Sequence, residues 1–364
     1  MRRKVIIAIL AAAMALCAVA CGDGDADKAD AGGSAGAGTT EASAATTDDG
    51  ASGATTDDGA SGGTDGTVTD GAETDAGGKP EGPPIDRDRM GNPIALPESI
   101  ETVVAIGPAI NVILSGLGML DKVVAADTYS YGVEGLDPAL AIFDMMALDG
   151  ERLINMAPDV ILTTGMTRIY GEDQITMVSD AGICVVYIPV SESLEGIMDD
   201  IRFLAAVMGE PDRGAALVAG MESDIEAVRA IGLTVTEPRK VYFEIGSPPY
   251  LYSFGGGVFL DEMIGLIGAV NVLAHIDGWV QISEEAVVDA NPDVILTNVN
   301  YNYYPADAAA EVADIMARPG WDALTAVADG AVHYIDTDSS SQPTQNVAKA
   351  LMEMARAIYP ELYS

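Results

Sequence analysis

The residues best suited to contact a ligand are aromatic, and several are concentrated in one stretch of the chain. Tyr301, Tyr303 and Tyr304 lie within four residues, whereas aromatic residues make up only 5% of the 364-residue sequence. They follow the end of a predicted strand, where a role in the core is not expected. Aromatic faces suit a large, flat, partly apolar ligand, such as a corrin or the rim of a metal chelate. Tyrosines also occur in turns without any ligand, so both roles stay open.

No pattern in the sequence is typical of a catalytic or bare-metal site. The chain has two histidines, His275 and His333, and no cluster of cysteine and histidine, whereas sites for zinc or manganese use several such ligands. The glycine-rich run 253–257 lacks the lysine of a phosphate-binding loop. No Gly-x-Ser-x-Gly segment occurs, and no pair of carboxylates stands apart as an acid and a base. We therefore predict no catalytic residue, no metal ligand and no cofactor, with His275 or a tyrosine as a haem ligand kept as an alternative.

A helix–strand unit occurs twice. One copy begins at Glu151 and the other, 134 residues later, at Glu285, and each places a Pro-Asp-Val-Ile-Leu run seven residues after the glutamate. A short apolar helix face precedes Pro158 or Pro292, and the helix ends there because the residue before proline is disfavoured in the α region. A buried strand follows. The duplication predicts two similar α/β lobes with a ligand cleft between them.

The rest of the pattern alternates strands with helices, which predicts a mainly parallel sheet in each of two Rossmann-like lobes and an α/β fold class. Strands are predicted at 103–106, 122–125, 159–163, 184–188, 240–245, 294–297 and 332–335. Helices are predicted at 111–117, 259–268 and 347–358. Two apolar faces between Leu194 and Ile231, interrupted at Gly209-Glu210-Pro211, predict a long, rigid helix that joins the lobes.

In sheets of this kind, ligands bind at loops that follow the carboxyl ends of the strands. In the first lobe these loops carry Asn111, Tyr129, Tyr131, Thr164, Met166 and Tyr170. In the second lobe they carry Ser247, Tyr250, Tyr252, Trp279, Asn300, Tyr301, Tyr303, Tyr304 and Asp338. We predict that these residues line the cleft.

The N-terminus predicts a secreted protein with a lipid anchor. Three basic residues at positions 2–4 precede an apolar run to Ala20 that is too short and wrongly flanked for a spanning helix. Ala18-Val19-Ala20-Cys21 resembles the lipobox of bacterial lipoproteins, although Ala18 replaces the usual leucine. Cys21 is therefore the predicted lipidation site, and an ordinary secretory signal is the alternative.

The composition of residues 22–85 predicts a disordered acidic tether. Gly, Ala, Ser, Thr and Asp dominate, and 45–53 recurs verbatim at 54–62. Such a segment cannot bury enough apolar surface to fold, and its coil reach is roughly 45 Å. The predicted organisation is a signal at 1–21, the tether at 22–85, a first lobe at 86–209, an inter-lobe helix at 210–236 and a second lobe at 237–364. Cys184 is the single cysteine of the folded part, so no intramolecular disulfide is expected.

The folded part is strongly acidic. The net charge is −38; the signal contributes +3 and the tether −12, so residues 86–364 carry −29. A field of this sign repels nucleic acid and anionic lipid headgroups, so nucleic acid is not an expected partner and the membrane is contacted through the anchor only. It also disfavours strongly anionic ligands, unless the charge serves solubility alone.

Residues 86–364 resemble the periplasmic-binding-protein family that serves cobalamin and ferric-siderophore ABC importers. The resemblance rests on the segments at residues 90–93, 96–97, 118–124 and 278–285 and on the two Pro-Asp-Val-Ile-Leu units. It implies two lobes joined by a rigid helix, a ligand held between them, and one surface glutamate per lobe that docks onto arginines of the permease. Glu151 and Glu285 match those glutamates, and Tyr129 and Trp279 match aromatic cleft positions of cobalamin binders. Stabilisation by the helix dipole is the local alternative for the glutamates.

These observations predict a monomeric, lipid-anchored substrate-binding protein on the extracytoplasmic face of the cell membrane. It is expected not to be an enzyme, and to deliver a metal chelate to an ABC permease and its ATPase. The scarcity of arginine favours a cobalamin-type corrinoid slightly over a ferric siderophore, because arginine pairs with anionic ligands. A haem receptor, a surface enzyme acting on glycans and a scaffold or adhesin are the alternatives.

Overall fold

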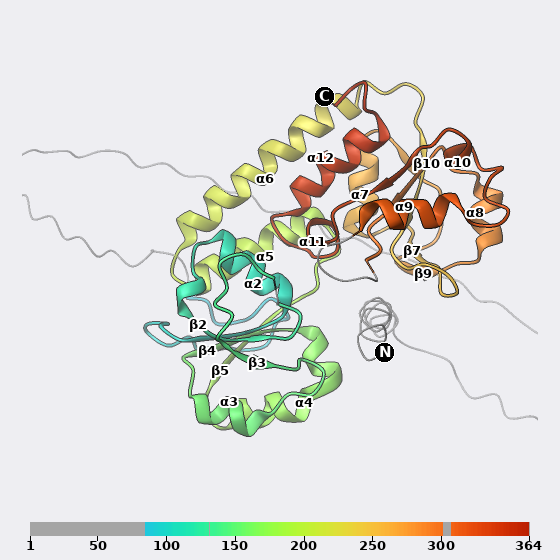
Figure 1. Cartoon of the computed structure of the whole chain (residues 1–364). Helices are drawn as coiled ribbons and strands as arrows, with labels where there is room; N and C mark the ends of the chain where they lie inside the picture. The colour runs from blue at the N-terminus through green and yellow to red at the C-terminus, as the bar shows by residue number, and fades with distance from the viewer. Residues whose placement is uncertain (1–83, 131, 301–306, 364) are drawn as a thin grey trace, which may run out of the picture. The chain divides into compact units, whose positions relative to one another are not determined.

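Two parallel sheets organise the chain, which a computed structural model describes at residues 84–130, 132–300 and 307–363 (Figure 1). The spatial order of strands in the first sheet is β3 (Ala141–Phe143), β2 (Val123–Asp127), β1 (Val103–Ile106), β4 (Val160–Thr164) and β5 (Cys184–Ile188). The order in the second sheet is β11 (Val332–Tyr334), β10 (Val294–Thr297), β6 (Lys240–Glu244) and β8 (Val270–Asn271). Strand order reverses between β1 and β4 and between β6 and β10, and such switch points leave a crevice at the carboxyl ends of the strands.

Helices cover both faces of the first sheet. The helices are α2 (Pro108–Gly116) and α5 (Leu194–Val207) on one face, and α3 (Gly150–Met156) and α4 (Gly165–Asp180) on the other. Successive side chains of a strand point to opposite faces, so Val103 of β1 packs with the first pair and Val104 with the second. Strands covered on both faces need apolar residues at every position, which explains the uninterrupted apolar runs in the sequence.

The second sheet is covered in the same way. The helices are α7 (Phe259–Leu266) and α12 (Val347–Ile358) on one face, and α8 (Glu284–Ala290), α9 (Ala308–Met316) and α10 (Thr325–Ala328) on the other. The remaining elements are η1 (Leu120–Lys122), α11 (Thr337–Ser340) and an antiparallel pair of strands, β7 (Tyr252–Phe254) and β9 (Trp279–Gln281).

Helix α6 (Pro211–Gly232) joins the two lobes through a shared apolar core. Its buried residues Val218, Met221, Ile225 and Val228 are spaced by three or four positions and form one face. The helix packs against α5 of the first lobe and against α7 and α12 of the second, as Figure 1 shows. A single cluster of buried apolar side chains thus includes residues of both sheets.

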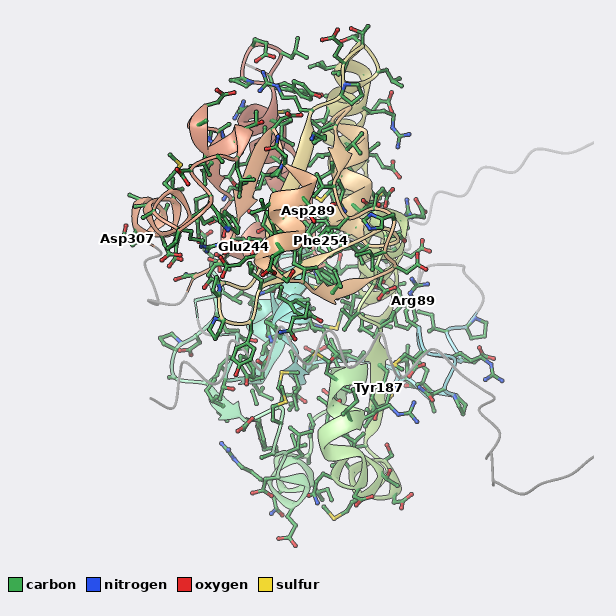
Figure 2. All side chains as sticks on the ribbon, turned by 90° about the vertical axis from the view of Figure 1, so that its right-hand side faces the viewer. Arg89, Tyr187, Glu244, Phe254, Asp289 and Asp307 are labelled. Atoms are coloured by element: carbon green, nitrogen blue, oxygen red, sulfur yellow. The ribbon has the colours of Figure 1, made fainter. Side chains whose placement is uncertain are left out.

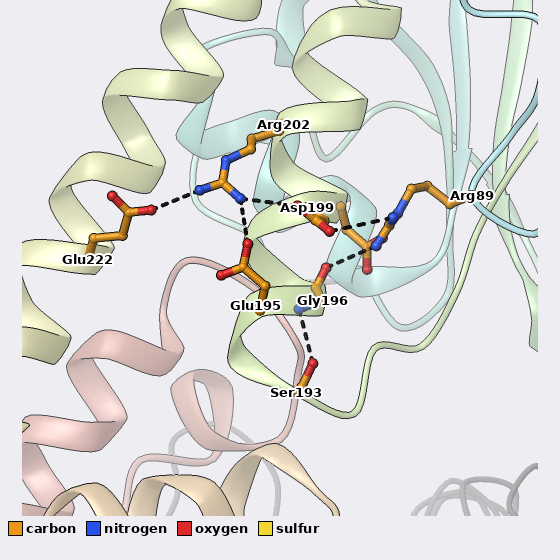
Figure 3. A network of polar contacts seen from close by, with 8 residues as sticks. Arg89, Ser193, Glu195, Gly196, Asp199, Arg202 and Glu222 are labelled. Atoms are coloured by element: carbon orange, nitrogen blue, oxygen red, sulfur yellow. Dashed lines mark hydrogen bonds and ion pairs between the residues drawn. The ribbon is translucent and has the colours of Figure 1, made fainter. Parts of the chain in front are cut away.

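Ion pairs fix α5 to α6 and to the segment that follows the tether (Figure 3). Arg202 of α5 donates to Glu222 of α6 at 2.8 Å, and Arg89 donates to Asp200 of α5 at 2.8 Å. Asp200 is buried, and burial raises the pKa of its carboxyl, while hydrogen bonds from Ser191 and Arg89 oppose the rise. The Arg202 pair is partly exposed and contributes little stability. The Arg89–Asp200 pair therefore holds the start of the first lobe.

The two copies of the repeated unit have the same caps. Asp149 is the N-cap of α3, and its side chain accepts a hydrogen bond from Arg152 N. Ser283 is the N-cap of α8, and its side chain accepts one from Ala286 N. Ala157 and Asn291 end the helices in the left-handed region, with φ of 47° and 42°. The residue before each proline thus leaves the right-handed helical region as predicted, and does so in a left-handed cap.

The aspartate that follows each proline joins its strand to the neighbouring strand. Asp159 Oδ2 accepts from Thr102 N at 2.8 Å, and Asp293 Oδ2 accepts from Lys240 N at 2.8 Å. These bonds set the start of β4 beside β1 and of β10 beside β6. Backbone hydrogen bonds from Glu101 and Thr102 lower the pKa of the Asp159 carboxyl. The unit therefore places one strand of each switch point.

The α/β fold class with two lobes and parallel sheets is confirmed, as are the strands at 103–106, 184–188 and 294–297 and the helix at 347–358. Two helix boundaries were wrong. The helix predicted from Asn111 begins at Pro108, because proline is favoured in the first helical turn. The helix predicted to reach Gly268 ends at Leu266, and Gly268 adopts φ +85° beyond it. The domain boundaries and the cleft between the lobes stay predictions.

The joint between the lobes requires glycine at the end of α6. A Cβ at Gly232 would lie 2.1 Å from Leu266 O and 2.8 Å from Ile267 C at the end of α7, whereas a Cβ at Gly220 of the same helix meets nothing within 4 Å. We expect Gly232→Ala to destabilise the protein by about 1–3 kcal/mol through overpacking. Gly220→Ala should instead stabilise it by about 0.5–1 kcal/mol. Urea unfolding measures both, and equal effects of the two variants would contradict this account.

Candidate functional site

The first switch point lies where β1 and β4 end. Gly107 begins the turn into α2 with φ of 146°, and a Cβ there would lie 2.7 Å from Thr164 Cγ2. Glycine therefore lets the two turns approach each other. Thr164 is 7% exposed, and its hydroxyl has no hydrogen-bond partner among the described residues. The sequence placed Thr164 among the cleft residues, and the structure puts it at the switch point.

A buried carboxylate at the end of β2 shapes the neighbouring loop. Asp127 accepts from Gly107 N at 2.8 Å, Tyr129 N at 2.7 Å and Ser130 Oγ at 2.6 Å. Burial raises the pKa of Asp127, and these hydrogen bonds oppose the rise. Tyr129 is held half-buried against the core that α3 and α4 share with the sheet. Sequence reasoning missed Asp127, although an acid that ends an apolar strand was a signal for it.

Besides Thr164, two further predicted cleft residues of the first lobe are buried. Asn111 is fully buried, and its Nδ2 donates to Ala105 O at 3.0 Å and to Ser130 Oγ at 2.8 Å. Met166 is 8% exposed and belongs to the core around α3 and α4. Asn111 therefore supports the loop that Asp127 and Ser130 form, because the fourth residue of α2 points back to the sheet. Its contact with a ligand stays a prediction.

Aromatic side chains of the second lobe are grouped at β7 and β9. Trp279 is half-buried, with ring centroids 5.9 Å from Phe254 and 6.4 Å from Phe259, both edge-on. Phe254 is fully buried (Figure 2). Tyr252 pairs with Gln281 as Phe254 pairs with Trp279, so these four residues share one face of the small sheet. We call Tyr252, Phe254, Trp279 and Gln281 the aromatic face.

Tyr250 lies outside the aromatic face. It is 70% exposed, in the turn that follows the Pro248–Pro249 pair. The hydroxyl of Tyr252 is buried and has no partner among the described residues, and burial raises its pKa. Of the two tyrosines, Tyr252 is the one that the structure places beside Trp279.

The second switch point carries a polar cluster. Asn298 follows β10, and its Nδ2 donates to Ser340 Oγ at 3.0 Å and to Ser341 Oγ at 3.1 Å. Thr337 Oγ1 of α11 donates to Asn298 O at 2.8 Å. The loops after the adjacent strands β10 and β11 are thereby joined. Asp338, a predicted cleft residue, lies exposed on α11.

One hydrogen bond from this polar cluster reaches the other lobe. Gln345 Nε2 donates to Val112 O of α2 at 2.8 Å. The side-chain oxygens of Gln342, Gln345 and the predicted Asn300 are buried without a partner among the described residues. Sequence reasoning named Asn300 but missed Asn298, Gln342 and Gln345. The run of polar residues at 339–346, between the last strand and the last helix, was the available signal.

Several predicted residues cannot be placed. Tyr131, Tyr301, Tyr303 and Tyr304 lie outside the described residues, as does Cys21. Tyr170 belongs to α4, but its side chain lies outside the described part of the structure. Their roles stay predictions.

The two repeated glutamates occupy equivalent, exposed positions. Glu151 and Glu285 are each the second residue of their helix, α3 or α8. A backbone hydrogen bond and the Ser283 hydroxyl lower the pKa of Glu285. Each carboxylate is therefore available to a partner while it lies at the positive end of a helix.

A buried ion pair supports the surface around Glu285. Arg318 donates to both carboxylate oxygens of Glu244, at 2.6 and 2.7 Å, and its guanidinium lies 4.7 Å from the Trp321 ring centroid. Two neighbouring hollows lie beside this pair: Arg318 lines one of about 430 Å³, and Trp321 lines the other, of about 730 Å³. Ser247, a predicted cleft residue, lines the smaller hollow, and Glu285 lines the larger. The surface beside Glu285 is therefore indented and acidic.

Within the described residues, no three His, Cys, Asp or Glu side chains are grouped so that they could hold a metal ion. Burial lowers the pKa of His333 on β11. No helix in the same part of the chain is long and apolar enough to cross a membrane.

Comparison with known proteins gives a consistent picture. Residues 103–339 match the profile of a family described as periplasmic binding protein. An uncharacterized ABC transporter substrate-binding lipoprotein of Bacillus subtilis is 27% identical over 304 residues, covering 82% of this chain and 93% of that protein. A cobalamin-binding protein of Halobacterium salinarum is 24% identical over 283 residues, covering 76% of this chain and 74% of that protein.

Solved structures share the fold. The heme-binding protein RhuT of Roseiflexus sp. RS-1 has a TM-score of 0.61 at 25% identity, covering 72% of this chain and 99% of that one. The vitamin B12-binding protein BtuF of Vibrio cholerae has a TM-score of 0.58 at 19% identity, covering 72% of this chain and 97% of that one. The match extends over both lobes in each case.

Proposed function

The chain belongs to the periplasmic binding protein family, and from this we propose that it is the substrate-binding lipoprotein of an ABC importer. It captures a metal chelate outside the cytoplasm and delivers it to a permease that an ATPase drives. The match to the substrate-binding lipoprotein of Bacillus subtilis over 93% of that protein's length supports this function. Capture and release without turnover is the expected activity, since members of this family act in transport.

A cobalamin-type corrinoid is the ligand class that we propose. The aromatic face carries this proposal, because Trp279 is only partly buried and its ring packs edge-on against Phe254 and Phe259. A corrin is large, flat and partly apolar, and stacks well on such a surface. The relatives named for cobalamin support the same ligand. A haem ligand is the second candidate, because RhuT, which is 25% identical, is a heme-binding protein.

Trp279 provides the test of this ligand. The purified chain should bind cyanocobalamin one to one, with quenching of tryptophan fluorescence. Trp279→Ala should weaken binding by roughly thirtyfold, because burying an aromatic ring contributes on the order of 2 kcal/mol. Trp321→Phe is the matched control: Trp321 is 1% exposed and packs on Arg318 and Tyr242, so affinity should hold. Haem and ferric siderophores are titrated in parallel. Tighter binding of either would make it the ligand in place of the corrinoid.

We also propose that Glu151 and Glu285 dock the protein onto basic residues of the permease. Reversal of either charge should leave ligand affinity unchanged and reduce uptake, because an exposed charge pair acts on the partner. Glu284→Arg is a matched control, since Glu284 begins the same helix and is also exposed. Uptake in cells and ligand binding by the purified variants are measured together. Loss of ligand binding in Glu285→Arg, or an equal loss of uptake in Glu284→Arg, would contradict the assignment.

Anchoring through Cys21 completes the proposal. The residue stands at the end of the predicted signal, and the tether of residues 22–85 separates it from the folded part. Cys21→Ala should move the protein from the membrane fraction to the soluble extracytoplasmic fraction with unchanged ligand affinity. Cys17→Ala, within the signal, should leave it membrane-bound. Retention of Cys21→Ala in washed membranes would show that the anchor lies elsewhere.

A further inference from the structure

Two buried acceptor oxygens at the second switch point have no donor within the described part of the chain. Asn300 Oδ1 and Gln342 Oε1 are buried and have no hydrogen-bond partner among the described residues. They belong to the loops after the adjacent strands β10 and β11, which the bonds from Asn298 to Ser340 and Ser341 join. Buried polar groups in native proteins are normally paired, and an unpaired acceptor is destabilising. A molecule that brings N–H or O–H donors to this edge would remove that cost.

Charge at the same edge also selects for donors. Residues 298–300 and 336–346 contain Asp336 and Asp338 but no lysine or arginine. The nearby Lys349 already pairs with Asp336 at 3.8 Å. Burial raises the pKa of Glu353, which accepts from Asp336 N. A carboxylate of a ligand would therefore meet acceptors and acids here, and would be repelled.

The two loops lie at the carboxyl edge of the second sheet, and a hydrogen bond connects one of them to the first lobe. Gln345, three residues beyond Gln342, donates to Val112 O of α2, and α2 begins at the first switch point. The polar cluster therefore approaches the carboxyl edges of both sheets, which is where ligands of parallel sheets bind. In contrast, the two hollows beside the Glu244–Arg318 pair include no residue of this cluster.

We infer that Asn300 and Gln342 determine ligand specificity by accepting hydrogen bonds from uncharged amide groups at the rim of the ligand. This inference rests on the proposed function, in which the ligand is a corrinoid. Primary amides supply N–H donors without charge. A macrocycle or chelate with carboxylates at its rim supplies only acceptors to the same two oxygens and adds negative charge to an acidic edge. The site therefore distinguishes an amide rim from its hydrolysed, acidic form.

The first experiment compares ligands that differ at the rim, with the protein unaltered. The purified full-length chain is titrated by calorimetry with cyanocobalamin and with cobalamin monocarboxylates, in each of which one rim amide is hydrolysed. At least one monocarboxylate should bind about 5- to 150-fold more weakly, the range expected when a buried polar group loses its partner. Absence of binding by cyanocobalamin itself would overturn the proposed function. Binding of cyanocobalamin and all monocarboxylates with equal affinity would overturn this inference alone.

Variants then assign the discrimination to these side chains. Gln342→Met keeps the length of the side chain but removes the acceptor. It should weaken the binding of cyanocobalamin and bring the ratio of cyanocobalamin affinity to monocarboxylate affinity close to one. Gln174→Met is the matched control, because Gln174 accepts from Gly150 N at 3.0 Å in the contact between α3 and α4. It should keep the ratio of the unaltered protein. An unchanged ratio in both Gln342→Met and an Asn300→Leu variant would assign the discrimination to other residues.

Discussion

The shared apolar core along α6 is the constraint on which the rest of the structure depends. Val218, Met221, Ile225 and Val228 insert between helices of both lobes, so the lobes meet across packed side chains. Such interiors are dense and have few alternative arrangements. Gly232 at the end of the helix shows how close the packing is, because even a methyl group there would overlap the backbone of α7. The two lobes are therefore joined by continuous packing along α6.

Duplication gives each lobe the same means of placing a strand at its switch point. The N-cap, the left-handed C-cap and the aspartate after proline recur in both copies. Each feature is local, and together they determine where β4 and β10 begin. The same short helices present Glu151 and Glu285 at their first turns. One piece of local structure thus positions both a strand at the switch point and a charge that faces solvent.

The sequence was sufficient for features that depend on local patterns. Apolar runs such as 184–188 predict buried strands because both faces of the sheet are covered, and the two glutamates were recognised as equivalent because each precedes a Pro-Asp-Val-Ile-Leu run at the same spacing. Features that depend on tertiary pairing were missed. Strands β7 and β9 have three residues each, too few for a period to appear, and only their pairing creates the aromatic face. The burial of Asn111 was not predicted, because helical phase within one turn decides between surface and core. The polar run at 339–346 indicated a polar loop, but the bond from Gln345 to Val112 across the lobes depends on tertiary pairing and could not be read from it.

A rigid joint changes how such a protein distinguishes ligands. When the lobes cannot close far, a poor ligand is not rejected by a failure to close, so selection has to come from groups already in place. Aromatic rings select for shape and apolar area but distinguish weakly between amide and acid at a rim. Polar groups with unmet hydrogen bonds distinguish these strongly, because the wrong ligand leaves them unpaired or repelled. The fixed core therefore makes the fixed acceptors at the second switch point useful: rigidity keeps them in place, and the acidic charge of the domain strengthens their preference for donors.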